Sequence, residues 1–149
     1  MGTEAVRIAA GTKRFGDSVV LDGIDLAVES GEFVAVLGRS GSGKSTLLRV
    51  LAGLESLSSG TVSWPAGGKR PHIGVVFQDA LLLPWLTVQG NVSYAKRFAH
   101  RRKGFDADYA AELMRRFGVD GLADRYPDQL SGGQAQRVAI LRAVATRPQ

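Results

Sequence analysis

The stretch that decides the fold class reads Gly38-Arg39-Ser40-Gly41-Ser42-Gly43-Lys44-Ser45. It matches the pattern G-x-x-x-x-G-K-[ST], and from this chain's own composition a chance match somewhere along it has odds of about one in a hundred. The stretch follows an all-apolar run, residues 33–37. It also begins a predicted helix, one face of which would carry Leu47, Leu48, Leu51 and Leu54. Glycines let successive backbone amides curl around a phosphate, and a helix N-terminus adds a partial positive charge. The sequence therefore predicts a phosphate-binding loop between a buried strand and a helix.

The same loop supplies side chains for a nucleotide and its metal ion. Lys44 can reach the β- and γ-phosphates, and the Ser45 hydroxyl can ligate Mg²⁺. The predicted nucleotide-binding residues are Gly38, Arg39, Ser40, Gly41, Ser42, Gly43, Lys44, Ser45 and Thr46. The alternative is a plain Gly/Ser connection with Lys44 at the surface, which the strand before it and the helix after it disfavour. The loop resembles that of the P-loop NTPases and indicates an α/β protein that binds a nucleoside triphosphate with Mg²⁺.

Length and composition are those of a globular domain. The chain has 149 residues, of which 44% are hydrophobic and 22% charged, enough for one domain with a core. No apolar run approaches the roughly 20 residues of a transmembrane helix. The lack of cysteine excludes disulfides and thiolate metal sites. The net charge is +5, and five Lys or Arg fall within residues 96–103, where a solvated helix face or turn is a better explanation than a nucleic-acid groove.

Hydrophobic patterns predict a strand-rich first part and a helical second part. Short strands are expected at residues 6–8, 19–21, 24–28, 33–37, 61–64 and 73–77, with a turn or loop at 65–70. Helices are expected at residues 44–54, from a Thr87 cap through Phe98, around 110–117 with Gly118 as the stop, and from a Ser131 cap to just before Pro148. The segment from about 79 to 131 is thus expected to be a helical insertion or subdomain.

A second glycine-rich helix start, Leu130-Ser131-Gly132-Gly133-Gln134, opens the last predicted helix. Ser131 as N-cap, followed by two glycines, exposes backbone N–H groups at a positive helix end, which favours a second anion site. Taken alone, Ser-Gly-Gly is more often a plain turn. One nucleotide rarely needs two such sites from one face, so the second site makes sense if it closes over the nucleotide of a partner chain.

With both stretches, the chain resembles the ATP-binding cassette (ABC) ATPases over essentially its whole length. Residues 130–140, LSGGQAQRVAI, look like the signature motif of that family. The resemblance implies that Gln78, after Phe77, approaches Mg²⁺ and the attacking water, so Gln78 and Lys44 are the catalytic candidates and Ser45 and Gln78 the metal ligands. It also implies that Phe15 stacks on adenine, although an aromatic in such a region is otherwise more often core. The signature residues that would meet the ATP of a second chain are Ser131, Gly132, Gly133 and Gln134.

Two departures from the family pattern matter. Leu141 stands where many relatives have alanine, which changes the packing of the signature helix. The chain ends at Gln149, before the apolar strand with the Asp-Glu (Walker B) pair, so we expect a fragment that lacks the C-terminal part and is inactive alone. The expected fold is an α/β P-loop NTPase core with N-terminal antiparallel β strands and a helical subdomain. Its expected regions are a strand-rich core at 1–78, a helical subdomain at 79–131 and the signature helix at 132–149.

The resemblance implies an ATP-binding and ATP-hydrolysing subunit of an ABC transporter. The expected partners are a second copy in a head-to-tail dimer, a transmembrane permease and, indirectly, a solute-binding protein, with no nucleic acid. The expected location is the cytoplasmic face of the cell membrane, as a peripheral protein.

The stretch Leu82-Leu83-Pro84-Trp85 resembles importers for nitrate, aliphatic sulfonates and taurine. Residues 79–85 are either a docking surface or a cover for the helical core. Three alternatives remain open: another ABC transporter, a soluble ABC ATPase acting on ribosomes or DNA, and a generic P-loop kinase or GTPase. The signature at 131–134 disfavours the last of these.

Overall fold

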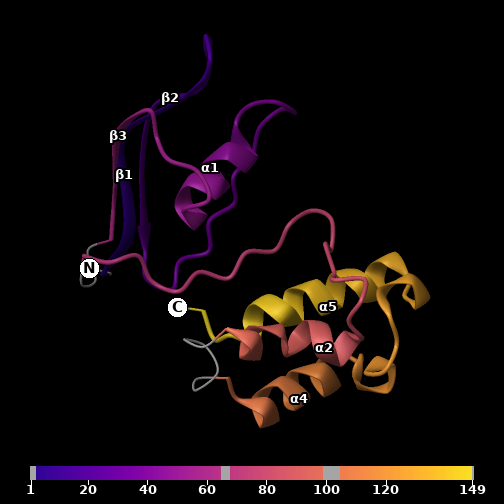
Figure 1. Ribbon diagram of the computed structural model, residues 1–149. Helices are drawn as coiled ribbons and strands as arrows, with labels where there is room; N and C mark the ends of the chain where they lie inside the picture. Colours follow the sequence, from indigo (N-terminus) through magenta and orange to yellow (C-terminus); the bar gives the residue numbers. More distant parts are fainter. Residues whose placement is uncertain (1–2, 65–67, 99–104, 149) are drawn as a thin grey trace. The chain divides into compact units, whose positions relative to one another are not determined.

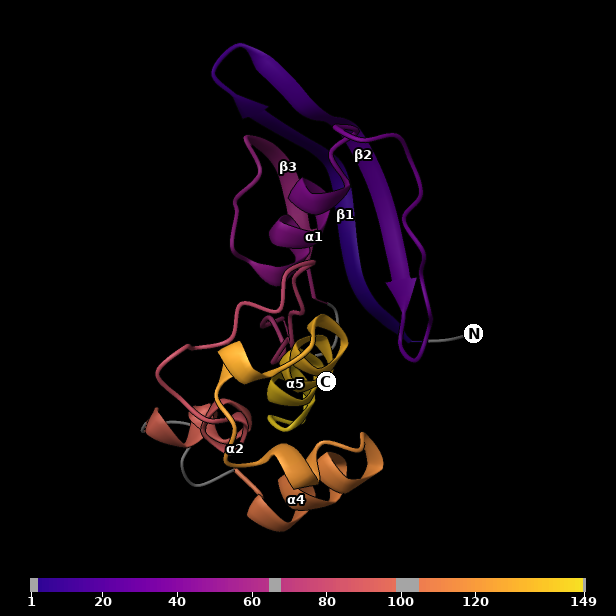
Figure 2. The same ribbon diagram turned by 90° about the vertical axis from the view of Figure 1, so that its right-hand side faces the viewer.

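The computed structural model describes residues 3–64, 68–98 and 105–148, and it divides into two compact units (Figures 1 and 2). The first unit is Met1–Pro71 and the second is His72–Gln149. The expected loop at 65–70 and the basic stretch at 96–103 lie in part outside the described residues. Neither the division expected at residue 78 nor the separate segment 132–149 coincides with this boundary, and both stay predictions.

The first unit is built on a three-stranded antiparallel sheet in the order β2-β1-β3 (Figure 2). The strands are β1 (Glu4–Phe15), β2 (Ser18–Glu29) and β3 (Ser59–Ser63). Ile8 is the central position of the sheet, since it pairs with Leu26 on β2 and with Val62 on β3. The three short strands expected before residue 30 are confirmed as one long hairpin. The backbone pairing of the hairpin continues through polar positions, where the hydrophobic pattern of the sequence is interrupted.

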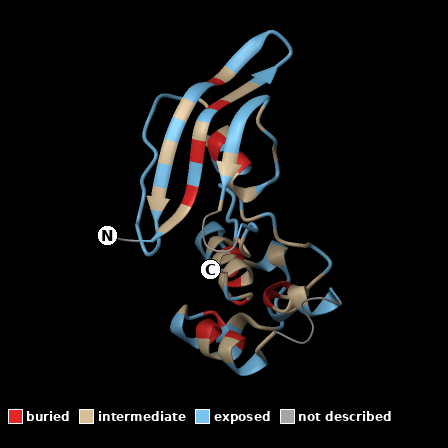
Figure 3. Ribbon diagram, turned by 90° about the vertical axis from the view of Figure 1, so that its left-hand side faces the viewer, coloured by how far each residue is buried: buried red, intermediate tan, exposed pale blue. Residues whose placement is uncertain are grey.

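One helix, α1 (Lys44–Ala52), packs against this sheet. The small core that joins them contains Ile8, Leu21, Leu47 and Val50 (Figure 3). The prediction of a helix directly after the glycine-rich loop is confirmed, although the helix ends at Ala52, with Gly53 as its C-cap, rather than at Leu54. Its predicted apolar face was only partly right, because Leu48 and Leu54 are exposed.

The strands expected at 33–37 and 73–77 are absent from the structure, and this prediction was wrong. Both segments have no regular secondary structure and are mostly exposed; Phe33 is 93% and Leu37 90% accessible to solvent. Within the described ranges, the strands form ladders only with one another. An apolar run becomes a strand only when a neighbour completes its backbone hydrogen bonds, and composition cannot supply that neighbour.

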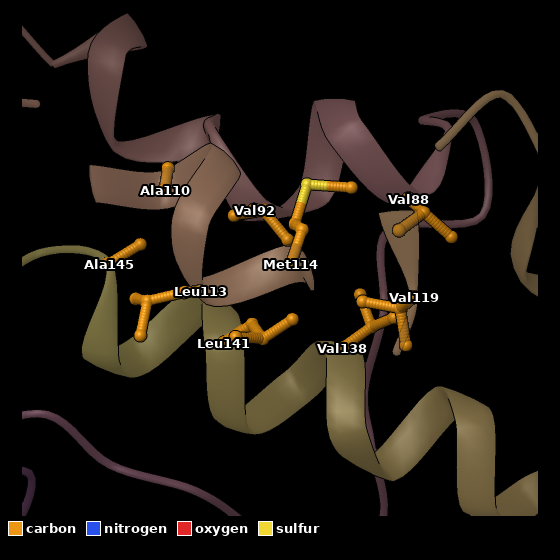
Figure 4. Packing of buried hydrophobic residues seen from close by; sticks show 9 residues of the cluster. All are labelled: Val88, Val92, Ala110, Leu113, Met114, Val119, Val138, Leu141 and Ala145. Carbon is orange, nitrogen blue, oxygen red and sulfur yellow. The ribbon is translucent and has the colours of Figure 1, made fainter. Parts of the chain in front are cut away.

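The second unit is helical, and its elements surround one core (Figure 4). The α-helices are α2 (Val88–Val92), α4 (Ala107–Arg116) and α5 (Gly132–Val144), with short 3-10 helices η1 (Tyr94–Arg97), η2 (Asp120–Leu122) and η3 (Pro127–Gln129). The core side chains are Val88, Val92, Ala110, Leu113, Met114, Val119, Val138, Leu141 and Ala145. Leu141 is fully buried at the centre of this core, so the larger side chain at this position has a packing role.

The caps of the second unit follow the sequence closely. The Thr87 side chain accepts a hydrogen bond from the Gly90 amide at 3.2 Å, as predicted. The single helix expected through Phe98 is instead two short pieces. Ser93 lies at the break, where its hydroxyl donates to the Gln89 carbonyl at 2.6 Å. Such local bonding from serine competes with regular helix and favours a helix end. In the part of the chain that the structure describes, no helix is long and apolar enough to cross a membrane.

Candidate functional site

Two glycines shape the glycine-rich loop before α1. Gly41 and Gly43 have φ angles of 80° and 90°, in the left-handed region that favours glycine. A Cβ atom on Gly43 would lie 2.7 Å from the Val20 carbonyl oxygen, so both the backbone conformation and the close approach of β2 disfavour a side chain there. The Ser42 amide donates to the Arg39 carbonyl at 3.2 Å and closes the turn.

Lys44 folds back over this loop. Its Nζ atom donates to the Gly38 carbonyl at 2.8 Å and to the Arg39 carbonyl at 2.6 Å, and it lies 3.4 Å from the Ser42 hydroxyl. The ammonium is therefore held within the curve of the loop, although it follows the loop in sequence. A phosphate oxygen carries a full charge and would be a stronger acceptor for this ammonium than either carbonyl.

The start of α1 fits an anion as well. Gly43 is the N-cap and has no side chain with which to satisfy the amides of the first turn. That turn begins Lys44-Ser45-Thr46 and carries no acidic residue, so the partial positive charge of the helix end is not compensated locally. Amides, an ammonium and an exposed Ser45 hydroxyl are the donor set that a phosphate with its magnesium ion requires.

The candidate metal ligands within the described ranges do not form a protein cage. No group of three or more His, Asp or Glu side chains gathers there that could hold a metal ion. Mg²⁺ commonly keeps several waters and is held by substrate phosphates with one or two protein oxygens. The Ser45 hydroxyl fits that arrangement.

Phe15 lies at the end of the sheet that borders the loop. It pairs with Ser18 across the β1–β2 hairpin, and Ser18 is two residues, about 7 Å, from Val20, which contacts Gly43. The ring is half exposed, and the Lys13 ammonium lies 4.8 Å from its centroid. The Lys13 ammonium therefore covers one face of the Phe15 ring, and an adenine stacked on Phe15 would use the rest of the ring.

Gln78 belongs to the second unit, so its predicted partnership with Lys44 and Ser45 stays a prediction. It lies exposed in a bend of the chain. The backbone around it is held by α5. The Gln136 side-chain amide donates to the Phe77 carbonyl at 3.2 Å, and the Arg142 guanidinium donates to the Ala80 and Leu81 carbonyls at 3.3 and 2.8 Å.

Ser131 and Gln134 form a reciprocal cap at the start of α5. The Gln134 amide donates to the Ser131 hydroxyl at 3.3 Å, and the Ser131 amide donates to the Gln134 side-chain oxygen at 2.9 Å. Gly132 and Gly133 lie between them and are exposed. A Cβ atom on either glycine would meet no described atom within 4 Å, and neither glycine has a left-handed φ. Nothing in the described part of this chain therefore requires glycine at these two positions.

The loop at 79–85 covers part of the helical core, and its role as a docking surface stays a prediction. Leu82 packs against the helical core, whereas Leu81 and Trp85 are 58% and 66% exposed. Asn91 fixes this conformation from inside the core. Its side chain is completely buried, accepts from the Leu83 amide, and donates to the carbonyls of Leu83, Leu86 and Thr87.

Sequence reasoning missed three residues whose side chains hydrogen-bond to the backbone of this segment, Asn91, Gln136 and Arg142. A signal was present for two of them, because Asn91 lies beside Val88 and Val92 on an apolar helical face, and Arg142 interrupts an apolar run. A polar side chain among core positions indicates a specific hydrogen-bonding role. Burial lowers the pKa of the Arg142 guanidinium, in agreement with its partly enclosed position.

The chain is similar to known proteins over most of its length. A family model described as ABC transporter matches residues 21–149. An aliphatic sulfonates import ATP-binding protein of Ralstonia nicotianae is 47% identical over 147 residues, which are 97% of this chain and 50% of that protein. A sulfate/thiosulfate import ATP-binding protein of Mycobacterium bovis is 42% identical over 153 residues, covering 99% of this chain and 44% of that protein. The chain spans about half the length of these relatives.

Solved structures agree on the fold. An ATP-binding subunit of an ABC transporter has a TM-score of 0.82 at 22% identity, covering 97% of this chain and 63% of that chain. A part of the cbiONQ ABC transporter complex of Clostridium perfringens has a TM-score of 0.80 at 28% identity, covering 98% and 63%.

Proposed function

The chain belongs to the ABC transporter family, and on that premise we propose that it binds ATP with Mg²⁺ as part of an importer's ATPase subunit. The observation that carries the proposal is the loop of residues 38–43 with the Lys44 ammonium held inside its curve. Lys44 would bind the terminal phosphates, the amides at the start of α1 would bind phosphate oxygens, and Ser45 would ligate Mg²⁺. Phe15 would contact the adenine ring, and Gln78 would complete the metal site and orient the attacking water. Hydrolysis of the bound ATP, in which the γ-phosphoryl group passes to water, would drive transport.

We propose further that Ser131–Gln134 acts on the nucleotide of a second copy. The free space around Gly132 and Gly133 supports this role, because glycine there leaves room for a close approach by another chain. Two head-to-tail sites would then enclose two nucleotides, and the γ-phosphate would bridge both chains. Hydrolysis would remove that bridge and reopen the dimer.

The proposed system is an importer for an aliphatic sulfonate or a related small solute such as nitrate or taurine. The names of the similar proteins, which include sulfonate and sulfate/thiosulfate import, support this assignment. A transmembrane permease would receive Leu81 and Trp85, the exposed apolar side chains of the 79–85 loop. Such docking would put the protein on the cytoplasmic face of the membrane, and a solute-binding protein would be an indirect partner. Loss of growth on an aliphatic sulfonate as sole sulfur source, after deletion of the gene, is the expected phenotype.

The nucleotide site is tested by titrating the purified protein with a fluorescent ATP analogue and Mg²⁺. Lys44→Ala should weaken binding by about 10- to 100-fold, because a hydrogen bond to a charged group contributes about 1.5–3 kcal/mol. The matched control is Lys69→Ala, which removes an exposed lysine of the same unit. Equal affinity of Lys44→Ala and the parent protein would contradict the proposal.

The dimer site is tested by size-exclusion chromatography with ATP under non-hydrolysing conditions. Gly133→Asp should leave ATP binding by the monomer intact and prevent ATP-dependent association, since a carboxylate there would face a phosphate. Gly121→Asp is the matched control, because Gly121 is also exposed and a Cβ there also meets no described atom within 4 Å. If Gly133→Asp associates as well as Gly121→Asp, the role across the dimer is wrong.

A further inference from the structure

The chain around Gln78 is held by hydrogen bonds from α5 on both sides of that residue. Gln136, near the start of α5, donates to the Phe77 carbonyl at 3.2 Å. Arg142, further along the same helix, donates through Nη1 to the Leu81 carbonyl at 2.8 Å and through Nη2 to the Ala80 carbonyl at 3.3 Å. A guanidinium presents its N–H groups in a rigid fork, so it can hold two successive carbonyls in a fixed relation.

The conformation that Arg142 holds is a strained one. Leu81 has a φ angle of 44°, in the left-handed region that leucine rarely adopts. Its side chain is mostly exposed, so core packing does not impose this conformation. A strained residue persists only where its surroundings over-determine it. The two hydrogen bonds from Arg142 lie directly at this residue and the one before it.

Arg142 has no other interaction in the described ranges that explains a cation at this position. None of the described ion pairs includes Arg142. The side chain is partly buried in an otherwise apolar stretch of α5, between Leu141 and Ala143. Enclosing a charge is unfavourable unless its hydrogen bonds are made, and here backbone carbonyls accept them.

The far end of the same loop is anchored independently by Asn91. Its four hydrogen bonds fix the backbone at Leu83, Leu86 and Thr87. Arg142 therefore governs only the segment between Gln78 and Leu83. A change at Arg142 should loosen that segment and leave the turn around Trp85 in place.

We propose that Arg142 is a positioning residue that fixes the segment 79–82 to α5, so that Gln78 and the loop after it move as one body with the helix that begins at Ser131. The attachment itself is independent of the proposed function. Its consequence, that displacement of the Ser131–Gln134 end carries the Gln78 segment with it, rests on that function.

The test is ¹⁵N relaxation of individual backbone amides, which reports mobility whether or not an amide is hydrogen-bonded. Arg142→Met keeps the length of the side chain and removes the donors; the order parameters of residues 80–82 should fall from the rigid range, about 0.85, to below about 0.6. The matched control is Arg137→Met, because Arg137 lies on the same helix and donates to the Phe117 carbonyl at 3.0 Å, away from this segment. It should leave the order parameters of residues 80–82 as they are in the parent.

A lysine variant separates positioning from general stability. Arg142→Lys keeps the charge but can serve one carbonyl at a time, so the order parameters of residues 80–82 should be intermediate between those of the parent and of Arg142→Met. If Arg142→Met does not fold, Arg142→Lys decides alone: lower order parameters confined to residues 80–82 support the proposal, and values equal to the parent overturn it. If Arg142→Met folds and has the order parameters of the parent, the proposal is likewise overturned. If Lys44→Ala binds ATP as tightly as the parent, the proposed function is overturned and this attachment still stands.

Discussion

Replacing glycine by alanine should have opposite effects on stability at the two glycine-rich helix starts. At Gly133 the added methyl group meets no described atom within 4 Å, and the backbone already has a φ that alanine accepts. Alanine in a helix is favoured over glycine by up to about 1 kcal/mol because glycine loses more backbone entropy on folding. At Gly43 the methyl group would lie 2.7 Å from the Val20 carbonyl oxygen, at a φ of 90°. Strain of this kind costs on the order of 1–3 kcal/mol.

The assay is thermal unfolding followed by circular dichroism. In a chain of this size, 1 kcal/mol shifts the midpoint by about 2–4 °C. Gly133→Ala should therefore raise the midpoint by up to about 4 °C, or leave it unchanged, while Gly43→Ala should lower it by several degrees. The same Gly133→Ala protein should associate less with ATP, since the methyl group occupies space proposed for the second chain.

A Gly133→Ala protein that melts clearly below the parent would show that the chain's own fold needs glycine at this position. A Gly43→Ala protein that melts at or above the parent would show that the loop does not approach β2 as closely as the structure has it. Either result would remove the structural argument that separates the two glycine motifs.

Three further perturbations test other parts of the structure. Phe33→Ser should change the free energy of unfolding by no more than about 0.5 kcal/mol and reduce self-association by light scattering, because Phe33 is exposed; a loss above about 3 kcal/mol would show a buried ring. Asn91→Ala should destabilise the helical unit by about 2–4 kcal/mol in urea unfolding, since buried backbone groups lose their partners; an unchanged midpoint would contradict this. Hydrogen bonds from Arg115 and Arg116 hold the pKa of Glu112 below its usual value. The small contribution of this carboxylate to stability is therefore present at pH values above its pKa in the unfolded chain, and it is lost as the pH falls through its pKa in the folded chain. Replacing both arginines by methionine should raise that pKa in an NMR titration, and an unchanged pKa would show that the pairs do not form in solution.

Predictions from the sequence succeeded where a feature depends on neighbours along the chain. The helix after the loop begins at Lys44, and the caps at Thr87 and Ser131 form as expected. Each depends on a side chain or a glycine within three or four residues of the amides it affects, so the local pattern suffices. Family membership followed from two such local motifs at a fixed separation.

Prediction failed where a feature depends on residues far apart in the chain. The apolar runs at 33–37 and 73–77 have the composition of buried strands, yet the structure gives them no ladder partner within the described ranges. A polar residue such as Arg142 gives no sign in sequence of which carbonyls it will meet, because its partners lie 61 and 62 residues away.

Sequence alone was enough to identify the glycine-rich loop before a helix, the second glycine-rich helix start and the resemblance to the ABC family, since those depend on short-range patterns. Only the folded chain shows which apolar runs become strands, and that Asn91 and Arg142 hydrogen-bond to the loop after Gln78. Backbone ladders, buried hydrogen bonds and free space around a glycine each require atoms that folding brings together from distant positions. The free energies of these features therefore depend on how the chain packs, and a local pattern of residues does not determine them.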